Sequence, residues 1–379
     1  LGADITLENE RFWMEQLPQR GQTSAEFIIL FGTRHLDASE RHEGMVAAIA
    51  VESLVKLIAF LAVGVFVTFI MFAGPGALLA EVAATPALIN SMRLENVPGG
   101  ATGWVGMLLL AFLAFFTLPR QFQVLVVENV DEQHLHRASW LFPLYLLLIN
   151  LFFIPIALAG LLPGGGDPDS FVLTLPLSAG LEGLPLLVFI GGLSAATGMV
   201  IVETIALSTM VSNQLIMPLL LKVKHLYIER HGRLADWLLN IRRIAILLIL
   251  LMGYLYHALI GDSYSLVTIG LVSFAGVAQF APALLIGLYW RGATRQGATL
   301  GLLAGFFIWF YTLLLPGFAQ SGWLKETLIT QGPWEISWLS PYALLGLTGW
   351  DIYTHSLFWS MLVNVSLLIG ISLFTRPTH

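Results

Sequence analysis

The sequence of 379 residues contains no cysteine, and only 11% of its residues are charged. The absence of cysteine excludes disulfide bonds and thiolate metal sites. A soluble domain carries roughly 25% charged residues, so a chain of this composition cannot cover its surface with polar groups. Because 57% of the residues are apolar, we expect most of the surface to face membrane lipids. The net charge of −6 gives no indication of a nucleic-acid partner.

The sequence also lacks the motifs that carry enzyme chemistry. It has no HExxH zinc motif, and His42-Glu43 is not followed by a nucleotide-binding glycine motif. We therefore predict no catalytic residues, no metal site and no resident cofactor within this chain.

Long apolar runs dominate the sequence. A hydrocarbon core of ~30 Å requires about 20 helical residues to cross it. The runs predict an all-α protein, a polytopic transmembrane helix bundle of about eight spans. The fourth run is far longer than one crossing, so it tilts, breaks or leaves the membrane as a helix. The predicted spans are Gly44–Gly74, Gly103–Leu118, Ser139–Leu162, Leu184–Leu221, Ile244–Ile260, Tyr264–Trp290, Gly297–Leu315 and His355–Phe374.

The distribution of lysine and arginine orients these spans. Two basic residues, Arg93 and Lys325, fall on one set of connections, and 13 fall on the other. The positive-inside rule places the richer side, and the C-terminus with it, in the cytoplasm. The 13 residues are Arg34, Arg41, Arg120, Arg137, Lys222, Lys224, Arg230, Arg233, Arg242, Arg243, Arg291, Arg295 and Arg376.

Two regions follow from this pattern. Residues 1–43 are predicted to form a polar N-terminal segment with the remnant of an earlier helix, because the apolar stretch Phe27–Gly32 is too short to cross. Residues 44–375 are predicted to form the transmembrane domain.

Three charged residues lie within predicted spans, where charges are costly and usually face the protein interior or a watery cavity. Glu52 and Lys56 are four residues apart, so they share a helix face and can pair. They are either a structural ion pair or part of the lining of a polar-solute or proton site. Glu203 is either a site residue or a buried, neutral, hydrogen-bonded acid.

Two stretches concentrate small residues. Gly191–Gly198 combines glycine and alanine with Ser194 and Thr197, which favours close helix packing or, if carbonyls are freed, coordination of a hard cation. Gly297, Gly301 and Gly305 form a GxxxGxxxG stripe, which indicates a close-packing face, with dimerisation as the alternative.

Several stretches of the chain are similar to a known transporter family. Phe274–Gly305, with Pro282 and the LYWR sequence ending at Arg291, Phe116–Glu128 (FTLPRQFQVLVVE) and Leu193–Asn213 resemble the sodium/solute symporter family, which has a five-plus-five inverted-repeat fold. The resemblance implies core helices five to ten plus two trailing helices, and therefore an incomplete inverted-repeat transporter fold. It implies an ion site at the backbone carbonyl of Ser194 and at Thr197 and Gly198.

The family commonly has hydroxyl residues at both of the last two positions, so Gly198 removes one oxygen ligand. The coupling ion implied is Na+ or H+, and H+ would suit Glu52 and Glu203 better than Na+ would.

A narrower resemblance adds a signalling role. Phe31–Gly44 (FGTRHLDASERHEG), Glu52–Leu57 and Trp350–Ser360 (WDIYTHSLFWS) are similar to a subgroup that forms the N-terminal membrane module of bacterial hybrid sensor histidine kinases. The resemblance implies a bacterial inner-membrane module that binds a small polar solute such as an amino acid or carboxylate. Translocation of that solute across the membrane is a further step that the resemblance allows.

The implied partners are lipids, the solute, and fused or associated histidine kinase domains of a two-component system outside this chain. The alternative is a stand-alone secondary transporter, a cation:solute symporter. A third hypothesis is a structural remnant that binds nothing.

Overall fold

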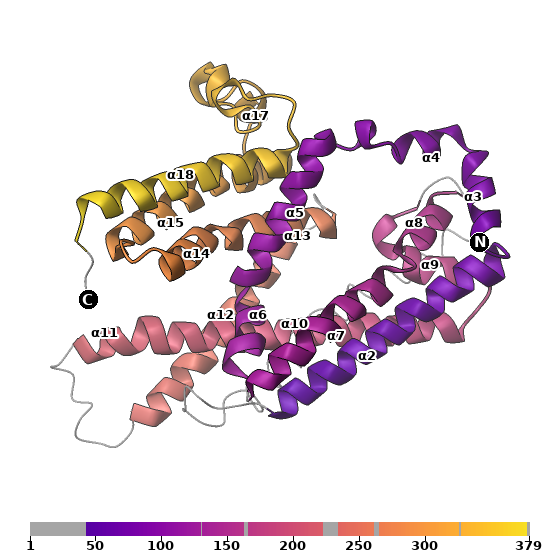
Figure 1. The fold of residues 1–379 in the computed structure, drawn as a ribbon, viewed down its shortest axis with the longest axis horizontal. Helices are drawn as coiled ribbons and strands as arrows, with labels where there is room; N and C mark the ends of the chain where they lie inside the picture. The colour runs from indigo at the N-terminus through magenta and orange to yellow at the C-terminus, as the bar shows by residue number, and fades with distance from the viewer. Residues whose placement is uncertain are drawn as a thin grey trace. The chain divides into compact units, whose positions relative to one another are not determined.

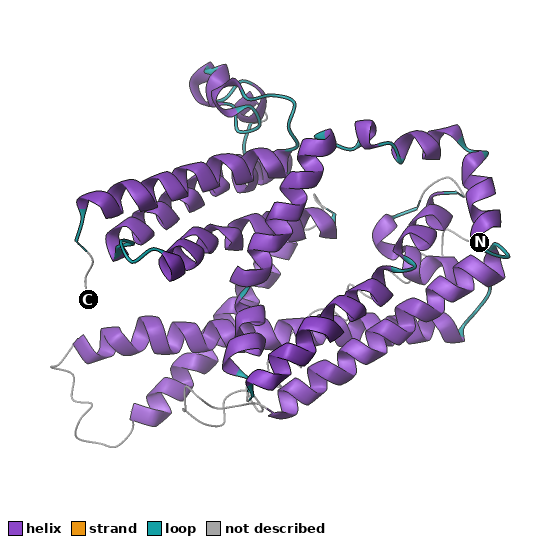
Figure 2. Cartoon of the chain, viewed as in Figure 1, coloured by secondary structure: helices purple, strands orange, loops and turns teal. Residues whose placement is uncertain are grey.

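The computed structural model describes residues 43–129, 131–162, 166–222, 234–260, 265–325 and 327–376. Within these ranges the regular elements are helices, and no strand occurs (Figure 2). The predicted N-terminal segment and its helix remnant lie outside the described residues, except for Glu43.

Eight helical runs among the described residues are long and apolar enough to cross a membrane, as the sequence predicts. They are Val46–Met71, Gly100–Thr117, Glu132–Leu161, Gly183–Leu219, Leu239–Ala258, Leu266–Tyr289, Arg295–Gln320 and Ile352–Phe374. The chain therefore has the all-α architecture of a multi-pass membrane protein.

The fifth span differs from its predicted bounds. The helix α12 (Leu234–Ile260) begins ten residues before the predicted start at Ile244. Arg242 and Arg243 therefore lie within a helix rather than in a connection, as the positive-inside argument had assumed. The hydropathy of the sequence falls at Arg242 and Arg243, so it placed the start of the span after them. The helix itself includes both arginines, because long basic side chains can direct their charged ends toward solvent or polar neighbours.

The chain divides into two compact units, which we describe separately. Unit 1 contains residues up to Leu78 and Phe122–Leu255, and unit 2 contains Leu79–Gln121 and the residues from Tyr256 onward. Three helices cross the division along the chain: α3 (Pro75–Ala83), α6 (Pro119–Phe122) and α12.

Unit 1 is organised around α2 (Glu43–Val65) and α10 (Gly183–Met210), which pack along each other (Figure 1). The helices α7, α8 and α9 also contact α2. A cluster of Ile205 on α10 and Ile246 on α12 joins those two helices. The remaining elements are η1 (Phe66–Met71), η3 (Gln123–Val127), α7 (Glu132–Asn150), α8 (Phe153–Leu161), η4 (Pro168–Ser170), α9 (Phe171–Ser178), η5 (Val211–Ile216) and α11 (Met217–Lys222).

The fourth span is one continuous helical run, and it does not break at its small residues. The α-helical part α10 has 28 residues, about 42 Å at 1.5 Å per residue, which exceeds the ~30 Å hydrocarbon core. The π-helix η5 and α11 continue it. The long run is therefore consistent with tilting or projecting beyond the core, and not with a discontinuous helix at Gly191–Gly198.

Unit 2 is organised around α15 (Arg295–Trp309) and α18 (Ile352–Phe374), which lie side by side (Figure 1). A core of six residues ties α5 and α13 to them: Leu110, Val272, Ala275, Ala278, Leu313 and Leu357. The other elements are α4 (Pro86–Ser91), η2 (Leu94–Asn96), α5 (Gly100–Thr117), α13 (Leu266–Val277), η8 (Ala278–Phe280), α14 (Ala281–Tyr289), η9 (Phe310–Leu314), α16 (Leu315–Gln320), α17 (Thr327–Thr330), η10 (Pro333–Glu335), η11 (Ser337–Leu339) and η12 (Leu344–Gly346).

The predicted glycine stripe packs within the chain. Gly297, Gly301 and Gly305 are all buried on α15 and face α18. A Cβ added at Gly301 would lie 2.6 Å from the backbone oxygen of Asn364. The stripe is therefore a close-packing face between two helices of one unit, and the dimerisation alternative is not needed to explain it.

Among the described residues there are four π-helical segments: η1, η5 and η9 lie within spans, and η3 follows α6 after the second span. Each segment buries one polar side chain: Thr68 in η1, Gln123 in η3, Ser212 in η5 and Thr312 in η9. Isolated π-helical turns are often found at functional sites. The sequence pattern gave no signal for them.

Candidate functional site

The predicted charges of α2 form a pair. Nζ of Lys56 lies 4.0 Å from Oε1 of Glu52, one helical turn away. The Glu52 residue is only 8% exposed, whereas 29% of the Lys56 side chain is exposed. The pairing expected from the four-residue spacing is thus present, with the carboxylate inside and the ammonium at the edge. The pair alone does not decide between a structural and a ligand-binding role.

The Glu52 carboxylate rests on a glycine of the neighbouring helix. A Cβ added at Gly198 of α10 would overlap Oε2 of Glu52. Two turns earlier on α10, a Cβ at Gly191 would lie 3.1 Å from Cβ of Ala59. The small residues of α10 therefore allow α2 to approach closely, and the space left by the missing side chain at Gly198 holds an acidic group.

A third helix reaches the same place. Oη of Tyr145 on α7 donates a hydrogen bond of 3.3 Å to the backbone oxygen of Ser53. The Tyr145 side chain is also close enough to Glu52 for the two to interact electrostatically. Glu52 is therefore surrounded by groups from α2, α7 and α10.

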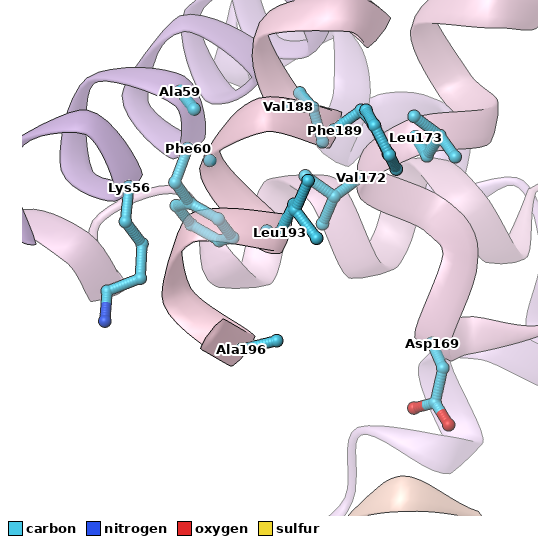
Figure 3. Close-up of a pocket in the computed structure, with 12 residues that line it drawn as sticks. Lys56, Ala59, Phe60, Asp169, Val172, Leu173, Val188, Phe189, Leu193 and Ala196 are labelled. Carbon is cyan, nitrogen blue, oxygen red and sulfur yellow. The ribbon is translucent and has the colours of Figure 1, made fainter. Parts of the chain in front are cut away.

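A groove of about 500 Å³ opens beside this cluster, between α2, α9 and α10. Figure 3 shows Lys56 at one side of the opening and Asp169 at the other, with aromatic and aliphatic side chains between them. Its lining residues are Lys56, Ala59, Phe60, Asp169, Val172, Leu173, Val188, Phe189, Gly191, Gly192, Leu193 and Ala196.

The groove combines one cation at its edge with mainly apolar walls. An ammonium group at the edge of an apolar cleft can hold an anionic group such as a carboxylate, while the apolar walls take up the rest of a small molecule. Among the described residues, no three His, Asp, Glu or Cys side chains come together to hold a metal ion.

The ion-site residues implied by the symporter resemblance lie beside the groove on α10. The Thr197 hydroxyl donates a hydrogen bond of 2.8 Å to the backbone oxygen of Leu193. Ser194 is half-buried within a regular α-helix, so its carbonyl belongs to the helical hydrogen-bond ladder. Gly198 contributes no side chain, and Glu52 occupies the space instead. The freed carbonyls that would favour a hard cation are thus absent from this stretch.

Glu203 does not line the groove. It is half-buried on α10, more than one turn beyond Gly198. Of the predicted residues, Lys56 lines the groove. Glu52 and Gly198 contact each other beside it, and Glu203 belongs to neither set.

Reasoning from the sequence missed one residue of the groove, Asp169, and one buried cation elsewhere in unit 1, Arg242. Asp169 stands in a polar connection, and nothing local indicates that η4 and α9 bring it to the groove. Arg242 is 2% exposed in α12, although the sequence analysis counted it as a residue of a connection. Its position next to a run of aliphatic residues was the only signal that could have suggested burial.

Replacing Gly198 with alanine is expected to displace the Glu52 carboxylate, because the added methyl group would occupy the position of Oε2. The cost should be about 1–2 kcal/mol of unfolding free energy, at the lower end for overpacking, since the end of a glutamate side chain can rotate away. A double-mutant cycle with Glu52→Ala, measured by denaturant unfolding in detergent, should show that the cost disappears when Glu52 is absent.

Gly253→Ala on α12 is the matched control, because no atom lies within 4 Å of the added Cβ. Additive effects of Gly198→Ala and Glu52→Ala would contradict the contact between these two residues.

Comparisons with known proteins give no family for this chain. No protein-family model matches it, and no curated protein matches it. The symporter resemblance thus rests on the stretches quoted from the sequence.

Proposed function

We propose that this chain is a membrane module that binds a small polar solute, an amino acid or carboxylate, in the groove of unit 1. The observation that carries the proposal is the position of Lys56, whose ammonium group stands at the edge of an apolar groove of about 500 Å³. A carboxylate of the solute would pair with Lys56, and the apolar part of the solute would contact the walls near Phe60 and Phe189.

Glu52 gives the groove a means of coupling to a proton. A solute carboxylate at Lys56 would compete with Glu52 for the same ammonium group, because Glu52 is its partner at 4.0 Å. Once Glu52 has lost its ammonium partner, its buried carboxylate takes up a proton more readily, because burial penalises the charged form. We therefore favour H+ over Na+ as the coupling ion, and the hydrogen bond of the Thr197 hydroxyl to its own helix supports this choice.

The resemblance to the membrane modules of bacterial sensor histidine kinases supplies the rest of the proposal. In that arrangement, solute occupancy in the inner membrane would be passed to a cytoplasmic signalling domain beyond the C-terminal end of α18. The competing proposal is a stand-alone cation:solute symporter. It is favoured by the same groove, and the two differ in whether the solute crosses the membrane and in whether a kinase responds.

The test uses the protein in proteoliposomes with radiolabelled amino acids and short monocarboxylates. Binding is measured at equilibrium, and uptake is measured under an imposed pH gradient and, separately, an imposed Na+ gradient. We expect saturable binding of one solute class that strengthens as the pH falls. Binding that is steep in Na+ and flat in pH would contradict the proton-coupled version, and absence of saturable binding by the whole panel would contradict the proposed function.

A further inference from the structure

The segment between α16 and α18 comprises residues 321–350, and side-chain hydrogen bonds fasten its described part to the spans. Oγ of Ser321 donates to the backbone oxygen of Gly317 at 3.0 Å, and three further bonds reach residues 339–344. Oη of Tyr311 donates to the backbone oxygen of Leu339. Nε2 of Gln320 donates to Oη of Tyr342 at 3.1 Å. The backbone N–H of Leu344 donates to Nε2 of His355 at 3.2 Å. We call this stretch the connecting segment, and of the three bonds to residues 339–344 only the last depends on a group that exchanges protons near neutral pH.

The connecting segment holds backbone strain. Trp334, Glu335 and Leu345 have positive φ angles of 55°, 61° and 55°. Such conformations cost about 1–3 kcal/mol each for residues other than glycine, and they persist only where surrounding contacts enforce them. Leu345 directly follows Leu344, so the bond to His355 holds one of the strained positions in place.

The imidazole of His355 is fixed in its neutral form by this bond. His355 is 1% exposed, and its Nε2 must be unprotonated to accept from Leu344. The proton of the neutral ring is therefore on Nδ1. That Nδ1 is buried and has no hydrogen-bond partner among the described residues.

Asp351, one helical turn before His355, has a carboxylate oxygen that can accept a hydrogen bond from the ring. Oδ1 of Asp351 caps α18 by accepting from the backbone N–H groups of Tyr353 and Thr354, both at 3.0 Å. Its Oδ2 is buried and has no hydrogen-bond partner among the described residues. Asp351 and His355 are four residues apart and so share a face of the helix, and the Asp351 charge acts on His355.

We propose that His355 is an acid-operated latch on the connecting segment. The neutral ring holds Leu344 through Nε2. When Nε2 takes up a proton from solvent, the ring has no lone pair left to accept a hydrogen bond, so the N–H of Leu344 is released. The imidazolium instead pairs with Oδ2 of Asp351. The two arrangements make a bistable element that a single proton shifts, and it operates independently of the groove in unit 1.

Other titratable groups near the latch do not compete with His355. Of the elements packed against α18, α5, α13 and η8 contain no ionisable side chain. The others contain Tyr289 on α14, Arg295 on α15 and Tyr311 on η9, and Arg295 lies beside Arg376, at the opposite end of α18 from His355. Burial, with a smaller contribution from Tyr353, raises the pKa of Tyr342 above its ordinary value, so its hydroxyl stays neutral at physiological pH. Tyr311, whose hydroxyl is bonded to Leu339, and Tyr353 are the other tyrosines near the latch. Among the described residues, His355 is influenced most by its burial and next by the charge of Asp351.

The test exploits the absence of native cysteine from the sequence. Leu344→Cys places a thiol in a buried position while keeping the backbone N–H, and Thr348→Cys places one in an exposed position four residues later. Both variants are labelled with maleimide in lipid nanodiscs, and the rate of the first is divided by the rate of the second. Taking this ratio corrects for the pH dependence of thiol reactivity, which affects both variants. We expect this ratio to rise about tenfold between about pH 8 and pH 5.

Two further substitutions separate the latch from general acid loosening. His355→Gln keeps an acceptor that does not titrate, so its labelling ratio should stay low at every pH. Asp351→Asn keeps the helix cap and removes the charge that stabilises the imidazolium, so the midpoint should move to lower pH. A ratio that is flat with His355 intact, or one that rises equally in His355→Gln, would overturn the proposal. If His355→Gln fails to fold, an unchanged midpoint in Asp351→Asn would overturn it instead.

Discussion

Replacing Gly301 with alanine is expected to lower the unfolding free energy of unit 2 by about 2–3 kcal/mol, toward the upper end for overpacking in a core. The added Cβ would lie 2.6 Å from the backbone oxygen of Asn364 and 3.2 Å from the backbone nitrogen of Leu368. Backbone atoms cannot rotate away as the end of a side chain can. The helices α15 and α18 would therefore have to separate.

This separation would also disturb a buried polar network. Nδ2 of Asn364 donates to the backbone oxygen of Gln279 at 2.8 Å, and Nε2 of Gln279 donates to Oγ of Ser360 at 2.9 Å. These groups are buried at membrane depth, where a lost hydrogen bond is not replaced by water. The loss of either bond adds to the cost of the overlap at Gly301.

The measurement is denaturant unfolding in detergent micelles, followed by tryptophan fluorescence. Gly370→Ala on α18 is the matched control, because no atom lies within 4 Å of its added Cβ. That substitution should be neutral or stabilising by up to about 1 kcal/mol, since alanine has the higher helix propensity. Equal effects of the two substitutions would show that the glycine stripe does not set the distance between α15 and α18.

Replacing Lys56 with methionine is expected to weaken solute binding at least tenfold and to lower the unfolding free energy by about 1–2 kcal/mol. The binding effect follows from removal of the cation at the edge of the groove. The stability effect follows because Glu52, which is 8% exposed, loses its cation. Breaking a fully buried pair costs roughly 3–5 kcal/mol. We expect less here, because the pair is 4.0 Å apart and 29% of the Lys56 side chain is exposed.

Binding is measured by isothermal titration with the solute class that the proteoliposome assay identifies, and stability by the same unfolding assay. Lys56→Arg keeps the charge and should retain most of the binding. Lys325→Met removes an exposed lysine of unit 2 and should change neither quantity. Unaltered stability in Lys56→Met would refute the energetic importance of the pair. Unaltered binding would refute the role of Lys56 in the groove.

The features that the sequence predicted correctly depend on neighbours along one helix. The existence of eight spans follows from the length of apolar runs, and the pairing of Glu52 with Lys56 follows from the four-residue repeat of the helix face. The GxxxGxxxG stripe likewise indicated close packing, because glycines four residues apart always share a face. None of these predictions requires knowledge of which helices meet.

The boundaries were less predictable than the spans. The start of α12 at Leu234 rather than near Ile244 depends on what surrounds Arg242, which is buried. The four π-helical segments each bury a polar side chain, such as Thr68 in η1 and Ser212 in η5. Hydropathy along the chain contains no information on either point.

The sequence by itself determined the class of the protein, an all-α chain in which eight of the described helical runs can cross a membrane. It also identified the residues whose charge is unusual at that depth. The tertiary structure alone decided that Glu52 rests on Gly198, that Asp169 faces the same groove as Lys56, and that His355 holds Leu344. The physical reason is the range of the interactions involved. Apolar length and helix periodicity act between residues near in sequence, whereas the groove and the latch form only where separate segments of the chain come into contact.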